Sequence, residues 1–274
     1  MKMKASRLII PLFLLTALIF SNVSAQQYPI PAIEVYPPPS KTFPLKVYWS
    51  QMVPGGCTVQ SKEMLYKTLH VAQLMLKHSI YRFLDENPNK YDELAQLKFI
   101  NVSSSEKADI TFNLFYEPPS GSYATLGYVA ISSIDGEIVK PYELYLNCWM
   151  VGRLSGEKIF NVALHELLHT LGLGHTKSCM MADGNLEIMA EHKPVEHEPQ
   201  TYVSTLDLYA LYRIYFTDVK FPKETGYRTF ISLDDWREWR QVTPYVVEFQ
   251  KLMKELNALH EKYEGLEAEI TGLR

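Results

Sequence analysis

Apolar residues recur at steps of three and four between residues 61 and 84, and at steps of two in several shorter runs that follow. The first spacing places them on one face of a long amphipathic helix, which Asn87-Pro88 ends. The runs of step two, with one short apolar run, predict strands over residues 45–49, 110–114, 126–134 and 142–147. This combination indicates a fold of the α+β class.

Two further helices are expected, from about Ser155 to Gly172 and from Ser204 to about Phe216. Ser204 is a favourable N-cap residue, and Asp207 three positions later completes the capping pattern. In residues 245–274 apolar positions again alternate steps of three and four, as in a coiled-coil seam: Phe249, Leu252, Leu256, Leu259, Tyr263, Leu266, Ile270 and Leu273. We expect this helical tail to self-associate or to dock in a groove. The alternative is a terminal helix packed on its own domain.

The N-terminal segment has the pattern of an export signal. Lys2, Lys4 and Arg7 precede an apolar run at residues 8–20, and Val23-Ser24-Ala25 has the small residues of a cleavage site. We therefore expect residues 1–25 to be a signal peptide, with an uncleaved anchor as the alternative. The prolines of residues 26–44 predict an extended linker before the folded domain.

Composition and charge exclude one class of partner. The 274 residues are 47% hydrophobic and 21% charged, which is typical of a globular protein. The formal net charge of −4 gives no sign of the basic face that nucleic-acid binding needs. We expect no nucleic acid as partner, and no membrane unless the N-terminal signal is retained. The three cysteines, Cys57, Cys148 and Cys179, allow one disulfide, and the sequence leaves the pair open.

Candidate chemistry is concentrated in NVALHELLHTLGLGHTKSCMMAD, which begins at Asn161. His165 and His169 lie one turn apart on the same face of a helix, which is the geometry that a single zinc ion needs from two imidazoles. Gly172 can adopt the positive φ of a helix C-cap, after which the chain can return His175 as a third ligand.

Three protein ligands leave the fourth position to water, as in catalytic zinc sites. Glu166 is adjacent to His165 and is the expected base that accepts a proton from this water. We therefore expect one catalytic Zn²⁺ ion per chain. The alternatives are a helix with incidental histidines, and a closed structural zinc site that includes Cys179.

The stretch HELLHTLGLGH resembles the HExxHxxGxxH signature of the metzincin clan of zinc endopeptidases at every fixed position. Residues 108–112, ADITF, resemble a matrixin strand, and Cys179-x-Met181 is similar to the archaemetzincin pattern. The resemblance implies a catalytic domain at residues 45–217 with a twisted mixed sheet, a long first helix, an active-site helix and a C-terminal helix. Residues 218–244 would then connect this domain to the tail.

The same resemblance implies roles for individual residues. Metzincins have a methionine-containing turn under the metal, for which Met181 is favoured and Met180 is the runner-up. The stretch LGYVA at residues 126–130 resembles the edge strand that pairs with bound peptide, which makes Gly127, Tyr128 and Ala130 candidate substrate-binding residues. No cysteine precedes Cys57, so the propeptide thiol that blocks zinc in matrixins is absent.

The sequence therefore predicts a zinc-dependent endopeptidase that is secreted or held at the extracellular surface and cleaves a peptide or protein substrate. A second hypothesis is a cell-surface assembly or adaptor protein that has a vestigial zinc site and forms a homo-oligomer through residues 245–274. Retention of Glu166 favours the enzyme, because a zinc ion used only for binding needs no base.

Overall fold

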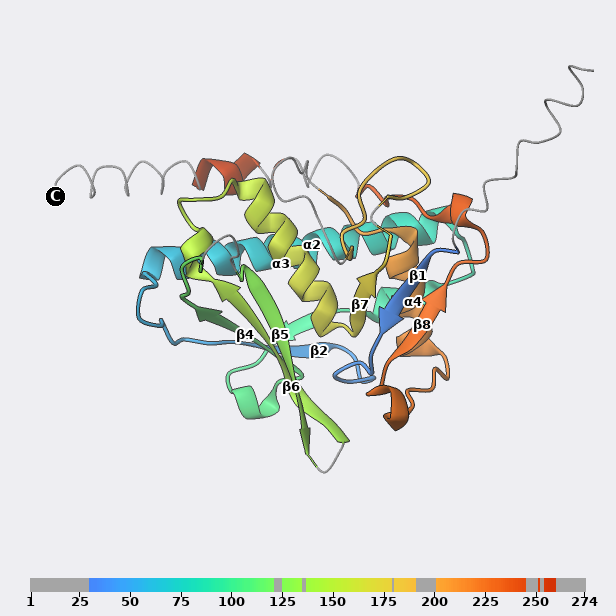
Figure 1. Ribbon diagram of the computed structural model, residues 1–274, viewed down its shortest axis with the longest axis horizontal. Helices are drawn as coiled ribbons and strands as arrows, with labels where there is room; N and C mark the ends of the chain where they lie inside the picture. The colour runs from blue at the N-terminus through green and yellow to red at the C-terminus, as the bar shows by residue number, and fades with distance from the viewer. Residues whose placement is uncertain are drawn as a thin grey trace, which may run out of the picture.

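The computed structural model describes residues 30–120, 125–134, 137–178, 180–190, 201–244, 251 and 254–259. This part of the chain combines helices with two β-sheets (Figure 1), so the predicted α+β class is confirmed. The helices are α2 (Val59–Glu86), α3 (Gly156–Thr170) and α4 (Thr205–Phe216). The strands are β1 (Ala32–Val35), β2 (Leu45–Trp49), β3 (Phe99–Asn101), β4 (Ile110–Phe115), β5 (Gly127–Ile134), β6 (Glu137–Asn147), β7 (Leu173–Thr176) and β8 (Thr229–Ser232).

The larger sheet is mixed and has the strand order β3-β2-β4-β6-β5. Its first four strands run parallel to their neighbours, and β5 pairs antiparallel with β6 at the edge of the sheet. The parallel strands β2 and β4 bury alternate apolar side chains, which places the core on one face of the sheet. The predicted mixed sheet is thus present, and β5 forms one of its edges.

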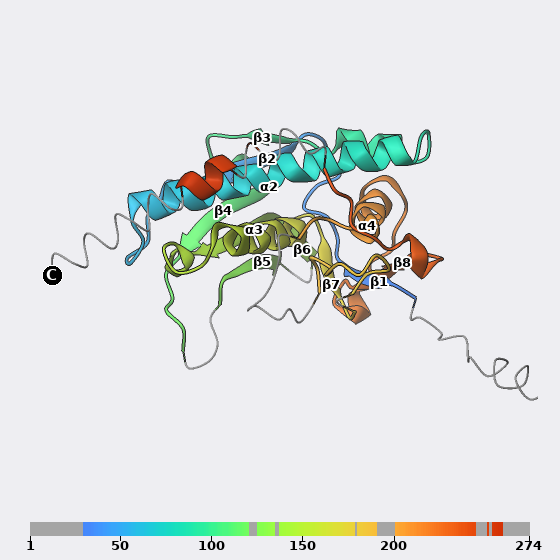
Figure 2. The same cartoon turned by 90° about the horizontal axis from the view of Figure 1, so that it is seen from above.

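The long helix α2 starts and stops where the sequence indicates. Thr58 caps its N-terminus by accepting a hydrogen bond from the Ser61 amide at 3.0 Å, and the Ser61 hydroxyl accepts one from the Thr58 amide at 2.9 Å. Asn87 closes the other end by donating its side-chain amide to the Phe83 carbonyl. The two helices α2 and α3 pack on each other (Figure 2), and their buried apolar faces belong to one continuous core.

A second sheet of order β7-β1-β8 corrects two of the predicted domain boundaries. Residues 26–44 were expected to be a linker, but β1 lies in this range, and its Ile33 and Val35 are fully buried. Residues 218–244 were expected to be a connector, but β8 pairs antiparallel with β1 along its whole length. Because β1 has a partner on both sides, tertiary pairing stabilises a strand that the nearby prolines conceal in the sequence.

The cysteine pair that the sequence left open is Cys57–Cys148, with 5.4 Å between the two Cα atoms. This disulfide joins the loop before α2 to the turn after β6. Cys179 lies outside the described residues.

Most of the predicted coiled-coil seam also lies outside the described residues. Within them, residues 254–259 are helical, and Leu256 is buried in the chain's own core. This is the packing expected of a terminal helix on its own domain, and self-association of the tail stays a prediction.

Candidate metal centre

The helix α3 carries two of the three histidines at a fixed spacing. Ser155 caps its N-terminus, and its buried apolar face anchors it in the core through Ile159, Phe160, Ala163, Leu164, Leu167 and Leu168. His165 and His169 therefore lie one turn apart, and their Nε2 atoms are 2.9 Å from each other. Burial of the apolar face therefore fixes the position of α3, and the helical spacing fixes His165 relative to His169.

Gly172 turns the chain back so that the third histidine joins the pair. Its φ of +94° is strained for any residue with a side chain, and an added Cβ would lie 2.8 Å from the Tyr36 carbonyl oxygen. The strand β7 follows immediately, and it places His175 Nε2 3.3 Å from His165 Nε2. The helix stop that was predicted at Gly172 is confirmed, and His175 returns on a strand.

Hydrogen bonds to backbone carbonyls orient the imidazoles of His165 and His169, so that their Nε2 atoms face the other histidines. His165 Nδ1 lies 2.7 Å from the Ile188 carbonyl oxygen, and His169 Nδ1 lies 2.7 Å from that of Leu173. A carbonyl only accepts, so each Nδ1 carries the proton, and each Nε2 presents a lone pair to the other histidines.

This donor set fits a metal ion. Ligand nitrogens of all three histidines lie within 4.8 Å of one another. Tetrahedral zinc with Zn–N near 2.0–2.1 Å requires ligand nitrogens about 3.3 Å apart, and the observed spacings of 2.9 and 3.3 Å are close to this. His165, His169 and His175 are therefore close enough to bind one metal ion.

Glu166 faces the same open cleft, although its side chain is almost fully buried. We call this cleft, with a volume of about 490 Å³, the metal cleft. Its lining residues are Glu34, Tyr36, Gly127, Tyr128, Val129, Ile131, His165, Glu166, His169, Leu173, Gly174 and His175. It thus brings the predicted base and the three predicted ligands together.

The edge strand β5 forms another wall of the metal cleft. Gly127 and Tyr128 line it as predicted, but Ala130 does not, and Val129 and Ile131 line it instead. The pairing of β5 with β6 shifts register between Ala130 and Ser132, so the faces of the strand change next to Ala130. The Tyr128 ring stacks on Tyr145 with ring centroids 4.7 Å apart. Burial of the hydroxyl, followed by the nearby Glu143, raises the pKa of Tyr128.

Sequence reasoning missed a further wall of the metal cleft, which Glu34 and Tyr36 supply from β1 and the residue after it. The Tyr36 hydroxyl donates to Glu34 Oε2 at 2.9 Å, and Arg228 lies 3.3 Å from Glu34 Oε1. Burial and the hydrogen bond to Glu34 raise the pKa of Tyr36 to about 12. Gly174 leaves room for this carboxylate, because an added Cβ would lie 2.9 Å from Glu34 Cβ. The alternation AIEVY at residues 32–36 was a strand signal hidden among prolines.

The two candidate methionines differ in burial. Met181 is 3% exposed and belongs to the core, whereas Met180 is 59% exposed. The backbone that contacts the histidines comes from a later segment. Ile188 bonds to His165 as described above, and the Met189 carbonyl accepts from the Thr176 amide at 2.8 Å, next to His175. The fully buried Met189 is thus a residue that the sequence reasoning did not consider.

No protein-family model matches the chain, and no curated protein matches it either. Among the described residues, no helix is both long enough and apolar enough to cross a membrane. The fold and the site together define an α+β protein with a three-histidine cluster that can hold a metal ion.

Proposed function

We propose that this protein is a zinc-dependent endopeptidase of the metzincin type. The observation that carries the proposal is the convergence of three imidazole Nε2 atoms beside the Glu166 carboxyl in one open cleft. Three neutral nitrogens with an accessible fourth position are the donor set of catalytic zinc rather than of a closed structural site. The HExxHxxGxxH spacing of these residues supports the same assignment.

The residues of the metal cleft would have different roles in peptide hydrolysis. His165, His169 and His175 would hold the ion. When bound, zinc supplies a Lewis acid that polarises the scissile carbonyl and lowers the pKa of water. Glu166 would accept a proton from the attacking water as its oxygen bonds to the scissile carbon, and would then pass this proton to the amine nitrogen as the C–N bond breaks.

An extended peptide fits the metal cleft as an added strand. Within the described residues β5 pairs on one side only, with β6, which leaves its other edge able to bond to a peptide main chain. The substrate would then lie between β5 and the wall formed by Glu34 and Tyr36. Main-chain pairing accepts many sequences, so side-chain selectivity falls to the residues of the cleft walls.

Export of the chain is part of the proposal. The sequence of residues 1–25 has the pattern of a signal peptide, and the disulfide Cys57–Cys148 is a bond that oxidising compartments favour. We therefore place the activity outside the cell or at its surface.

The test is hydrolysis of casein by zinc-loaded protein, with and without a chelator. Glu166→Ala should retain zinc and lose about 10²–10⁴-fold in rate, since general-base catalysis contributes this much. The matched control is Glu157→Ala, because Glu157 is an exposed carboxylate in the first turn of the same helix. A wild-type protein that binds zinc and cleaves no protein or peptide would contradict the proposal and favour the adaptor hypothesis.

A further inference from the structure

Two acidic residues that do not line the metal cleft are buried near each other. Glu187 and Asp207 are both 0% exposed, and they lie close enough for the charge of Glu187 to act on Asp207. Two neighbouring carboxylates cannot both be charged in a buried site, because neither their repulsion nor their desolvation would be compensated. One proton must therefore lie between them.

The contacts of Asp207 show which residue carries this proton. Its Oδ2 accepts a hydrogen bond from the Ser204 amide at 2.8 Å. Its Oδ1 is buried, and no donor in the described structure points to it. Burial, together with the charge of Glu187, raises the pKa of Asp207 well above its ordinary value. Asp207 is therefore the neutral acid of the pair, and the buried Oδ1 is the oxygen able to donate a proton toward Glu187.

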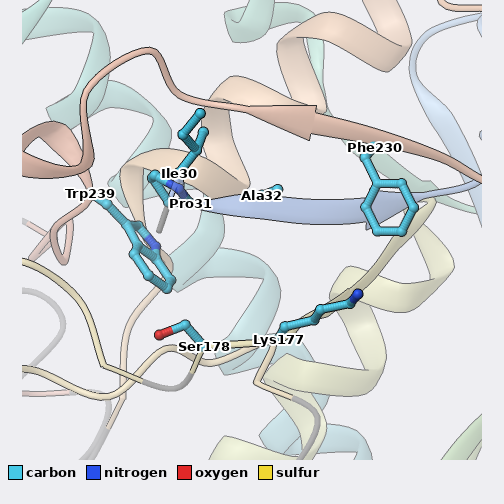
Figure 3. A pocket seen from close by; sticks show the side chains of 7 residues that line it. All are labelled: Ile30, Pro31, Ala32, Lys177, Ser178, Phe230 and Trp239. Carbon is cyan, nitrogen blue, oxygen red and sulfur yellow. The ribbon is translucent and has the colours of Figure 1, made fainter. Parts of the chain in front are cut away.

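The side chain of Glu187 accepts two hydrogen bonds. Its Oε2 accepts from Trp239 Nε1 at 2.7 Å, and its Oε1 accepts from the Met189 amide at 3.2 Å. Trp239 is buried in the core and lines a cavity of about 430 Å³ at the end of β1 (Figure 3). Two donors thus hold this carboxylate, and one of them, Trp239, comes from the segment after β8.

The backbone that this carboxylate holds is the backbone that orients the histidines. Glu187 is bonded to the amide of Met189, and the intervening Ile188 presents its carbonyl to His165 Nδ1 at 2.7 Å. The Met189 carbonyl accepts from Thr176, the neighbour of His175. A shift of this tripeptide would therefore turn His165 and release the strand that carries His175.

We propose that Glu187, with the proton that Asp207 donates and the indole of Trp239, positions the metal ligands His165 and His175 by holding the backbone of residues 187–189. Glu187, Asp207 and Trp239 are positioning residues, because none of them lines the metal cleft. The inference rests on the proposed zinc site. Replacing a residue that orients a ligating histidine without touching the metal typically weakens metal binding by about 10–100-fold.

The experiment measures zinc affinity by competition with a chelating dye, using the full chain. Trp239→Phe keeps a large ring and removes only the donor to Glu187, so zinc should bind about tenfold more weakly. The control is Trp49→Phe, which removes an equivalent indole bond, from Trp49 Nε1 to Asn101 Oδ1 at 2.8 Å, on the five-stranded sheet. It should leave the affinity unchanged.

A second pair of variants separates positioning from stability. Asp207→Asn retains an acceptor for Ser204 and a donor for Glu187, and should bind zinc like the wild type. Asp207→Ala has neither and should bind at least about tenfold more weakly. Absorption bands of the Co²⁺-loaded proteins report the ligand geometry directly, and circular dichroism at the assay temperature shows that each variant is folded.

The outcomes are distinct. Weaker zinc binding and altered Co²⁺ bands in folded Trp239→Phe, with Asp207→Asn like the wild type, support the proposal. Equal affinities of Trp239→Phe and Trp49→Phe overturn it, as does a loss in Asp207→Asn as large as in Asp207→Ala. A wild-type chain that binds no zinc refutes the proposed function itself. If Asp207→Ala does not fold, the comparison of the two tryptophan variants still decides.

Discussion

Gly127, the first residue of the edge strand β5, lies directly against the side chain of Glu166. A Cβ added at Gly127 would be 2.7 Å from Glu166 Cγ and 3.1 Å from its Oε1. A separation of 2.7 Å is shorter than real Cβ contacts, so only a residue without a side chain at position 127 leaves room for Glu166 in this position. The residue proposed to bind peptide thereby also positions the proposed base.

We therefore expect Gly127→Ala to displace Glu166 and to lower kcat by at least about tenfold, within the range that general-base catalysis contributes. Zinc content should stay at one ion per chain, because the described hydrogen bonds of the three histidines do not involve Gly127. Gly55→Ala is the control, since no atom lies within 4 Å of a Cβ added there. Equal rates for the two variants would show that the contact has no catalytic consequence.

Glu34 should give the cleft a preference for cationic side chains. Among the described residues that line the metal cleft, Glu34 and Glu166 are the only acids, and none is lysine or arginine. A charge-assisted hydrogen bond to a substrate lysine would favour it over the isosteric norleucine. We expect Glu34→Gln to reduce the lysine-to-norleucine ratio of kcat/KM by about tenfold, for peptides that differ at one position near the cut.

Arg228→Gln should raise the same ratio, because it removes the cation that now shares the Glu34 carboxylate. The two variants together distinguish a charge effect from a general loss of activity. A ratio that is the same in wild type and Glu34→Gln, at every position tested, rules the preference out.

The disulfide Cys57–Cys148 should contribute strongly to stability. It closes a loop with a sequence separation of 91, for which loop-closure entropy predicts about 4–5 kcal/mol. Replacing both cysteines by serine should lower the free energy of unfolding in urea by this order. The measurement is made on metal-free protein, so that zinc binding does not mask the change. A double variant as stable as the wild type would show that the bond is dispensable.

Asp207 should make stability fall as pH rises. The folded protein holds its proton well above the ordinary pKa of 3.8, while the unfolded chain releases it near that value. The stabilisation is therefore complete below about pH 4 and is lost as the pH rises through the folded-state pKa. Asp207→Asn cannot titrate, so the wild type should lose stability relative to this variant over that range. A constant difference between their urea midpoints from pH 4 to 8 would contradict the assignment.

The tail predictions can be tested at one residue and by one truncation. Leu256 is fully buried in the chain's own core, so Leu256→Asp should lower the thermal midpoint by several degrees. Truncation after Thr243 should do the same. The predicted self-association requires in addition that the full chain has a larger molecular mass in solution than the truncated one. If both are monomers, residues 245–274 do not form an oligomer.

Local sequence alone determined the parts of this protein whose structure depends on neighbours in the chain. The prediction of a helix over 61–84 is correct to within two residues at each end of α2. It succeeded because the spacing of the apolar face and the stop at Asn87 are local signals. The cap at Ser204 and the turn at Gly172 were predicted for the same reason. Since i and i+4 share a helix face, the pairing of His165 with His169 also followed from spacing.

Only the tertiary structure decided which distant segments complete the site. The four-residue strand β1 depends on β7 and β8 for its hydrogen bonds, so no local pattern could place Glu34 and Tyr36 at the metal cleft. The same holds for the Ile188 carbonyl on His165, the Trp239 indole on Glu187 and the choice of Cys148 as partner of Cys57. Each of these contacts joins residues far apart in the chain, and burial in a common core, rather than local propensity, brings them together.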